Sequence, residues 1–268
     1  MEHGGVYCLV IDELKYVISG NDASFCKGKV VVHNPSLAEI RDYGEDRYAA
    51  EMSAIVMRPY DAAVMLDDAG LNYQEIKDFD LFLLTIRATL PEPSLLIPSI
   101  SFKEFEVGVN PDNGRPILYH PAKGIIIDEL IYTQIVEYVR AIHFIRAAID
   151  YDAGNSATRQ YLIRKMRRDM ERRKRKPHSS QYSSIISALV NNANCKYNYE
   201  SIWQLKVSQL WDSFFRVNKL QSYQNTMIGV YTGNVDAGKL DKDTLSWFGR
   251  IDVNAATKPD ASKAVTTT

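Results

Sequence analysis

The sequence has little cysteine and lacks the clustered residues that hold metals. Its 268 residues include three cysteines, Cys8, Cys26 and Cys195, with no close pair. An odd, scattered set fits a reducing compartment rather than a disulfide framework. The five histidines are scattered as well, so the closely spaced Cys and His ligands of a zinc site are missing. We therefore predict no metal and no cofactor.

Long apolar runs are also missing. No stretch approaches the ~20 apolar residues that a membrane-spanning helix needs. The early apolar run Val6–Ile11 is short, and Asp12 and Glu13 follow it directly, which does not fit the apolar region of a signal peptide. We therefore expect a cytoplasmic protein with no membrane partner.

Neither excess charge nor a catalytic motif is present. The formal net charge is −1, so no global field attracts the chain to nucleic acid or membranes. There is no G-x-S-x-G nucleophile elbow and no glycine-rich phosphate-binding loop. The acidic pairs Asp67-Asp68 and Asp78/Asp80 lack the spacing of a calcium-binding loop and are typical of helix ends. These absences predict that the protein is not an enzyme and has no catalytic residues.

The first half of the chain has a mixed pattern of strands and helices. The first 34 residues favour a small sheet, with β-rich runs at Val6–Ile11, Tyr16–Ile18 and Lys29–His33. Ser36 and Glu39 form a capping box that predicts the start of a helix. Apolar periodicity and helix-end signals predict further helices over residues 59–70, 73–87 and 129–149.

An inserted β-element interrupts this helical pattern. Six prolines and several turn formers break any helix between Leu90 and Asp128. The β-rich runs there are Phe102–Val109, Ile117–Tyr119 and Ile125–Ile127, and Asp112–Gly114 supplies the first hairpin turn. We therefore predict a three-stranded antiparallel meander at about residues 100–128.

The least ordinary segment is Arg159–Lys176, which holds ten basic residues and two acidic ones. We predict a helix that is basic over most of its circumference and ends before Pro177. Three interpretations stay open: an arm that neutralises nucleic-acid phosphates, an arm that docks on an acidic protein surface, and a solvated helix balanced by acid elsewhere. The lack of a recognition module and of interleaved aromatics weighs against sequence-specific nucleic-acid binding.

The remaining chain predicts helices with an aromatic face. They cover Ser183–Val190, Ile202–Lys219 and Gln221–Tyr231. Aromatic side chains are favoured both in cores and at binding hot spots, so the tryptophans are candidates for either place. The candidate partner-binding residues are Arg167, Arg168, Arg172, Arg173, Lys174, Arg175, Lys176, Trp203, Trp211 and Trp247.

These elements together predict an α+β protein that is predominantly helical. The turn formers near residues 150–155 suggest a boundary. Residues 1–152 would form an α+β half with the inserted meander, and residues 153–251 a helical half that begins with the basic helix. The composition of residues 252–268 predicts a disordered tail.

Stretches from both halves carry a family resemblance. In the first half they are Asn34–Tyr48, Pro59–Asp61 and Leu71–Leu83. In the second half they are Ile185–Val190, Tyr197–Trp203, Met227–Asp236 and Leu245–Trp247. Together they resemble a family of tail morphogenesis proteins, similar to tail assembly chaperones, from tailed phages and prophages of Gram-positive bacteria. The resemblance covers about residues 30–250 and consists of packing and turn residues.

This resemblance implies a non-enzymatic tail assembly protein. Its implied partner is the tape-measure protein or another tail component, such as the tail tube, bound before or during tube assembly. The implied location is the host cytoplasm, with the virion as the alternative. Two other functions stay open, namely a structural virion protein of the tail, neck or baseplate, and a nucleic-acid-binding protein that uses the basic helix. Self-association stays open with each of them.

Overall fold

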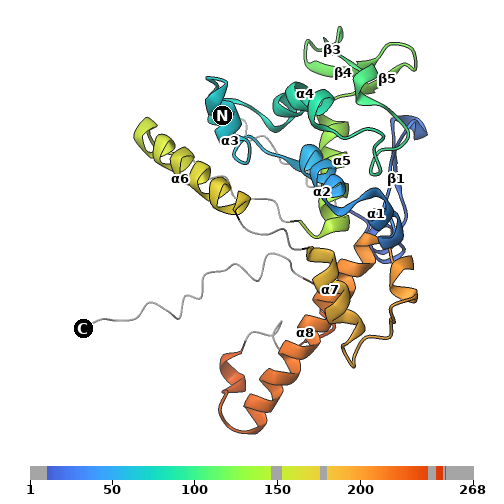
Figure 1. Cartoon of the computed structure of the whole chain (residues 1–268), viewed down its shortest axis with the longest axis vertical. Helices are drawn as coiled ribbons and strands as arrows, with labels where there is room; N and C mark the ends of the chain where they lie inside the picture. The colour runs from blue at the N-terminus through green and yellow to red at the C-terminus, as the bar shows by residue number, and fades with distance from the viewer. Residues whose placement is uncertain (1–10, 146–152, 176–179, 241–245, 250, 252–268) are drawn as a thin grey trace.

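The fold is a set of helices with two small, separate antiparallel sheets (Figure 1). The computed structural model describes residues 11–145, 153–175, 180–240, 246–249 and 251. The predicted fold class, α+β and predominantly helical, is confirmed. The strand predicted at Val6–Ile11, the helix end near Ile149, the site residue Lys176 and the tail from Asp252 fall wholly or mainly outside the described residues.

The first sheet has two strands, β1 (Ala23–Phe25) and β2 (Val30–Val32), paired with Ala23 opposite Val32. The prediction of a strand at Tyr16–Ile18 was wrong, because a π-helix, η1 (Leu14–Ile18), occupies this segment. The Tyr16 ring packs edge-on against the ring of Tyr138, with centroids 5.3 Å apart. Such tertiary packing overrides the strand preference of these residues.

Four helices follow the first sheet: α1 (Leu37–Tyr43), α2 (Glu45–Val56), α3 (Ala63–Asp68) and α4 (Asp78–Thr89). The capping box is confirmed, because Ser36 accepts from the Glu39 N–H and the Glu39 carboxylate accepts from the Ser36 N–H. The helix predicted from Tyr73 begins later, at Asp78. A 3₁₀ turn, η3 (Tyr73–Glu75), precedes it and is capped by the side chain of Asn72.

The predicted meander is confirmed. After a short 3₁₀ turn, η4 (Phe102–Glu104), its strands are β3 (Glu106–Val109), β4 (Pro116–His120) and β5 (Ile125–Ile127), in the order β3-β4-β5. One face of the sheet packs on α4 and on the next helix, α5 (Glu129–His143), and buries Leu118 and Ile127 completely. Helix α5 ends at His143, where Phe144 adopts a left-handed conformation, so the helix predicted to continue to about Ile149 is interrupted there.

The last part of the chain contains α6 (Ser156–Lys174), α7 (Gln181–Val190), η5 (Ser201–Gln204), α8 (Val207–Tyr231) and η6 (Ala237–Lys239). The two helices predicted over residues 202–231 are one continuous helix, α8, that starts five residues later. Its start is fixed by backbone pairing, in which Leu37 N–H donates to Leu205 O at 2.9 Å and Val207 N–H donates to Pro35 O at 2.8 Å.

One hydrophobic core connects the two predicted halves. It includes Tyr48 of α2, Phe82 of α4 and Val139 of α5, and extends to Leu189 of α7 and Leu210 of α8. The N-terminal part of α8 packs against α5 and η1. The boundary proposed at residues 152 and 153 stays a prediction. Because the N-terminal part of α8 belongs to this shared core, the core determines the point from which the rest of α8 extends.

Candidate partner-binding surfaces

The basic helix α6 is anchored on α3 along one side. Ile163 is buried in a second, small hydrophobic cluster with Ala62 and Leu66, and Met166 packs against that cluster. Next to them, the Arg167 guanidinium contacts Asp68 at 2.8 Å and Asp67 at 3.4 Å. This carboxylate pair raises the pKa of Arg167. The acidic pair at the end of α3 therefore holds the basic helix in place.

The other sides of α6 expose a dense set of cations. Arg168, Arg172, Arg173, Lys174 and Arg175, all predicted site residues, are exposed, as are Arg164 and Lys165. The nearest described carboxylate to Arg172 is that of Asp169, at 3.9 Å. In Figure 1, α6 lies at the margin of the molecule beyond α3. Of the predicted cations that are described, Arg167 alone is in an ion pair that joins α6 to another helix; the rest form a basic surface.

Two of the predicted tryptophans belong to the packing around α8. Trp211 stacks on Phe215, with ring centroids 6.0 Å apart and an interplanar angle of 25°, and lies near Tyr182. Trp203 is half-buried, and the guanidinium of Arg41 lies 5.0 Å from its ring centroid. Both pack against the main core. Their aromatic surfaces therefore form the base from which α8 extends.

Beyond this base, α8 and a returning segment form what we call the arm, residues 216–231 and 246–249. Figure 1 shows α8 extending away from the helices around α5. Apolar side chains are widely exposed on the arm, with Ile228 61%, Tyr231 82% and Phe248 75% accessible. The predicted site residue Trp247 is also exposed. Contiguous exposed apolar patches mark interaction sites, so these side chains make the arm a candidate interaction surface.

The returning segment is fastened to α8 by one arginine. Arg216 Nη1 donates to the carbonyl oxygens of Trp247 at 3.0 Å and Gly249 at 2.8 Å. Arg216 and Lys219 are the only charged residues of the helical part of the arm. The helical part of the arm therefore carries little charge, whereas α6 is strongly basic.

The base of α8 is tied to the first sheet by a polar network that sequence inspection missed. Asn34 Nδ2 donates to Ser208 Oγ at 2.9 Å, and His33 lies between Asp22 (3.0 Å) and Glu39 (3.1 Å). Partial burial opposes ionisation of Glu39, but hydrogen bonds from Ser36 and His33 lower its pKa to about 2. Asn34 and Ser208 lie 174 residues apart in sequence, so no local motif indicates that they meet.

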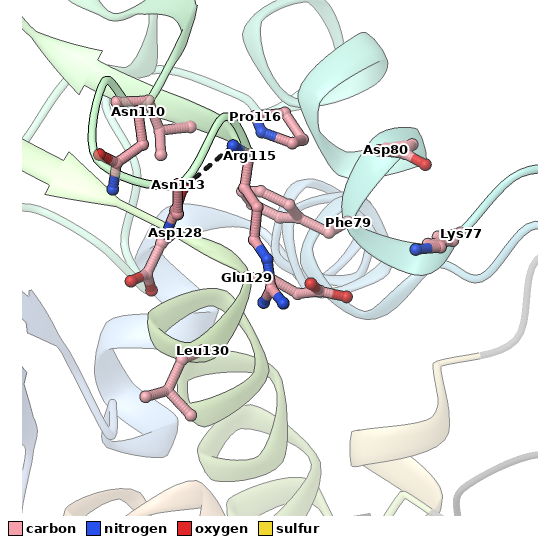
Figure 2. Close-up of a pocket in the computed structure, with 11 residues that line it drawn as sticks. Lys77, Phe79, Asp80, Asn110, Asn113, Arg115, Pro116, Asp128, Glu129 and Leu130 are labelled. Atoms are coloured by element: carbon pink, nitrogen blue, oxygen red, sulfur yellow. Dashed lines mark hydrogen bonds between the residues drawn. The ribbon is translucent and has the colours of Figure 1, made fainter. Parts of the chain in front are cut away.

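A polar cleft of about 300 Å³ lies between the meander hairpin and the N-termini of α4 and α5 (Figure 2). Its lining mixes the cations Lys77 and Arg115 with carboxylates that include Glu129. Several lining groups already serve local structure: Asp128 caps α5 through Ile131 N–H at 2.8 Å, and Asn113 accepts from Arg115 N–H. The cleft has no single sign of charge that would select a ligand.

The described residues show neither a metal cluster nor a membrane span. Within these ranges, no group of three or more His, Cys, Asp or Glu side chains is arranged to hold a metal ion. Asp67 and Asp68 contact Arg167, and Asp78 contacts Arg58 at 3.3 Å. None of the described helices combines the length and apolar character that crossing a bilayer requires.

The comparisons with known proteins place a match on the part of the chain that forms the arm. A family model described as "YomV second domain", a phage- and prophage-associated family name, matches residues 174–252. The match includes α7, α8 and the returning segment, and begins at the end of the basic helix. Comparison with curated proteins and with solved structures gave no match. The phage association suggested by the resemblance is therefore supported for this part of the chain.

Proposed function

We propose that this protein is a non-enzymatic phage tail assembly protein, a chaperone that binds the tape-measure protein or another tail component. The observation that carries the proposal is the arm, which exposes apolar side chains within the phage-associated region. A chaperone of this kind needs exposed apolar surface to hold an assembly partner, and it needs no catalytic site.

In this proposal the arm and α6 have different tasks. The arm provides the apolar contact, since burying an Ile or Tyr side chain contributes about 1.5–3 kcal/mol. Helix α6 provides charge, which steers an acidic partner and increases the association rate. The packing of α6 on α3 and of α8 on α5 would hold both surfaces in place before the partner arrives.

Two other functions would use the same surfaces. A structural virion protein would keep the arm buried between subunits, which its exposed aromatics favour. A nucleic-acid-binding protein would use the exposed cations of α6, and its affinity would fall by orders of magnitude as salt rises. Cytoplasmic location belongs to the chaperone proposal, whereas the virion belongs to the structural alternative.

The proposal predicts that two aspartates on the arm weaken capture of the tape-measure protein. In co-expression with the tape-measure protein of the same phage, Ile228→Asp/Tyr231→Asp should reduce recovery of the complex about tenfold or more, because an apolar contact is lost and charge is buried. Asn218→Asp/Ser222→Asp adds the same charge on another face of α8 and should bind like the wild type. Equal capture by all three proteins would contradict a role for the arm.

Charge reversal on α6 tests the second surface in the same assay. Arg172→Glu, Arg173→Glu, Lys174→Glu and Arg175→Glu together should weaken capture by about tenfold at low salt and less at high salt. The matched control changes the three arginines to lysine and keeps the charge. Unchanged binding after reversal would count against α6, and loss of binding only after nuclease treatment would favour the nucleic-acid alternative.

A further inference from the structure

The outer edge of the meander has the features of a second interface, independent of the proposed function. β3 is an edge strand: it pairs with β4 on one side, and the described residues place no strand on its other side. Its Val107 and Val109 are 51% and 66% exposed. The opposite edge is covered, since Cys26 Sγ donates to Ile126 O at 3.4 Å and Lys29 Nζ to Lys123 O at 2.7 Å.

The hairpin geometry shows which main-chain groups of β3 face outward. Asn110 N–H donates to Arg115 O at 2.8 Å, which makes these two residues a hydrogen-bonded pair. Because hydrogen-bonded and non-hydrogen-bonded pairs alternate along an antiparallel ladder, Gly108 and Glu106 also bond to β4. Val107 and Val109 therefore direct their N–H and C=O groups away from the sheet. Pro116, opposite Val109, has no N–H to offer.

This edge lacks the features that normally prevent strands from pairing. Proteins block exposed edges with lysine, proline, bulges or covering loops. β3 contains Glu106 as its one charge, and the Tyr119 hydroxyl donates to that carboxylate. Gly108 leaves no gap either, because the Tyr119 ring lies over it, 2.9 Å from where a Cβ would be. The outer edge of β3 is therefore open, with two exposed valines and one charged residue.

We propose that β3 pairs antiparallel with β3 of a second copy of this chain, about a two-fold axis through Gly108. This register opposes Val107 to Val109 of the second copy, and the reverse, so that the outward groups of both strands form four hydrogen bonds. An isologous contact closes at two copies. The result is one six-stranded sheet.

The side chains support a second copy as the occupant. Val107 and Val109 lie on the same face as Leu118 and Ile127, so the symmetric register brings four valines together beside the buried part of the sheet. On the other face Glu106 opposes Asn110 of the second copy, whose amide can donate to the carboxylate, rather than the like-charged Glu106. The strand is thus complementary to itself in hydrogen bonding, shape and charge.

Sedimentation equilibrium on the full chain tests the pairing. The interface is small, so we expect a weak dimer, with the average mass rising from 30.4 kDa toward twice that value between about 10 μM and 1 mM. Val109→Pro removes one outward N–H and spares the bonds to β4, and Val107→Lys adds an edge charge. Both should stay monomeric.

Ile126→Lys is the matched control, since Ile126 is an exposed residue of the same sheet on the covered edge. It should associate like the wild type. A wild type that remains monomeric at 1 mM would overturn the proposal and would favour pairing of β3 with a strand of another protein. Dimerisation of Val107→Lys with the wild-type affinity would overturn it as well, and this variant does not depend on proline being tolerated.

Discussion

Replacing Glu51 by alanine is expected to lower the free energy of unfolding by about 3–5 kcal/mol, because three donors, two of them on buried residues, would lose their acceptor. Glu51 lies on α2 and is 0% exposed. Its carboxylate accepts from the Leu95 N–H at 3.1 Å, the Leu96 N–H at 2.9 Å and the Ser94 hydroxyl. These three donors belong to the loop Ser94–Leu96, which places Leu96 in the core. One carboxylate therefore organises a stretch that has no regular secondary structure.

Two neighbours of Glu51 hold the same loop through hydrogen bonds. The hydroxyl of Tyr43 and the guanidinium of Arg47 both donate to Pro93 O, at 2.9 and 3.0 Å. Burial, together with the nearby charge of Glu51, raises the pKa of Tyr43 to about 12. The loop is therefore held by side chains of α1 and α2 at several points. Glu51 is the fully buried one among them.

Urea denaturation measures this prediction. Glu51→Gln keeps the shape but replaces one acceptor oxygen with a donor, so its loss should be smaller than that of alanine. Glu171→Ala removes an exposed carboxylate on α6 and should change stability by no more than about 0.5 kcal/mol. A loss below about 1 kcal/mol for Glu51→Ala would show that the loop does not depend on this carboxylate.

Stability is expected to fall by about 3 kcal/mol between pH 6.5 and pH 4 because of one buried histidine. His143 is buried at the end of α5, and this burial lowers its pKa from 6.5 to about 4, against an opposing hydrogen bond to Val139 O. A depressed pKa means that the unfolded chain takes up the proton first. The contribution is therefore complete above pH 6.5 and is lost as the pH falls through about 4.

The hydrogen bonds of His143 explain why it stays neutral. Its Nδ1 lies 2.7 Å from Val139 O and must donate, so Nε2 accepts from the Tyr48 hydroxyl at 2.7 Å. Tyr48 is itself fully buried, and burial raises its pKa well above the ordinary value. Neither group has a counter-charge among these contacts that would favour the imidazolium form.

The pH dependence of urea unfolding for His143→Gln measures this effect. The variant should be less stable than the wild type at pH 7. Its free energy of unfolding should no longer fall between pH 6.5 and 4 as that of the wild type does. Glu39→Gln should instead reduce the slope between about pH 4.5 and 2, since the pKa of Glu39 is lowered from 4.5 to about 2. A wild-type slope retained in His143→Gln would assign the acid sensitivity to other groups.

Local signals in the sequence predicted the parts of the fold that depend on local chemistry. The capping box at Ser36, the meander turn at Asp112–Gly114 and the basic helix were all predictable because caps, turns and charge runs act within a few residues. The π-helix at Tyr16 and the delayed start of α8 at Val207 were not, because contacts with Tyr138 and Pro35 determine them. Those partners lie more than a hundred residues away in the chain.

The candidate surfaces, too, were predictable only where they depend on local sequence and not on distant contacts. The cations of α6 were visible in the sequence. Arg167 differs from the other cations because it forms ion pairs with Asp67 and Asp68, which lie 100 and 99 residues away in the chain. The tryptophans were the aromatic candidates in the sequence, yet Ile228 and Tyr231 are exposed in the structure whereas Trp203 and Trp211 are half-buried. Exposure depends on what covers a residue, and a single sequence does not contain that information.

The central claim, that the chain assists tail assembly and then leaves, is tested most directly by quantitative mass spectrometry of purified phage particles beside the lysate of infected cells. We predict abundant protein in the lysate and none retained in particles. A fixed copy number in purified particles would contradict the chaperone proposal and identify a structural component of the tail, neck or baseplate.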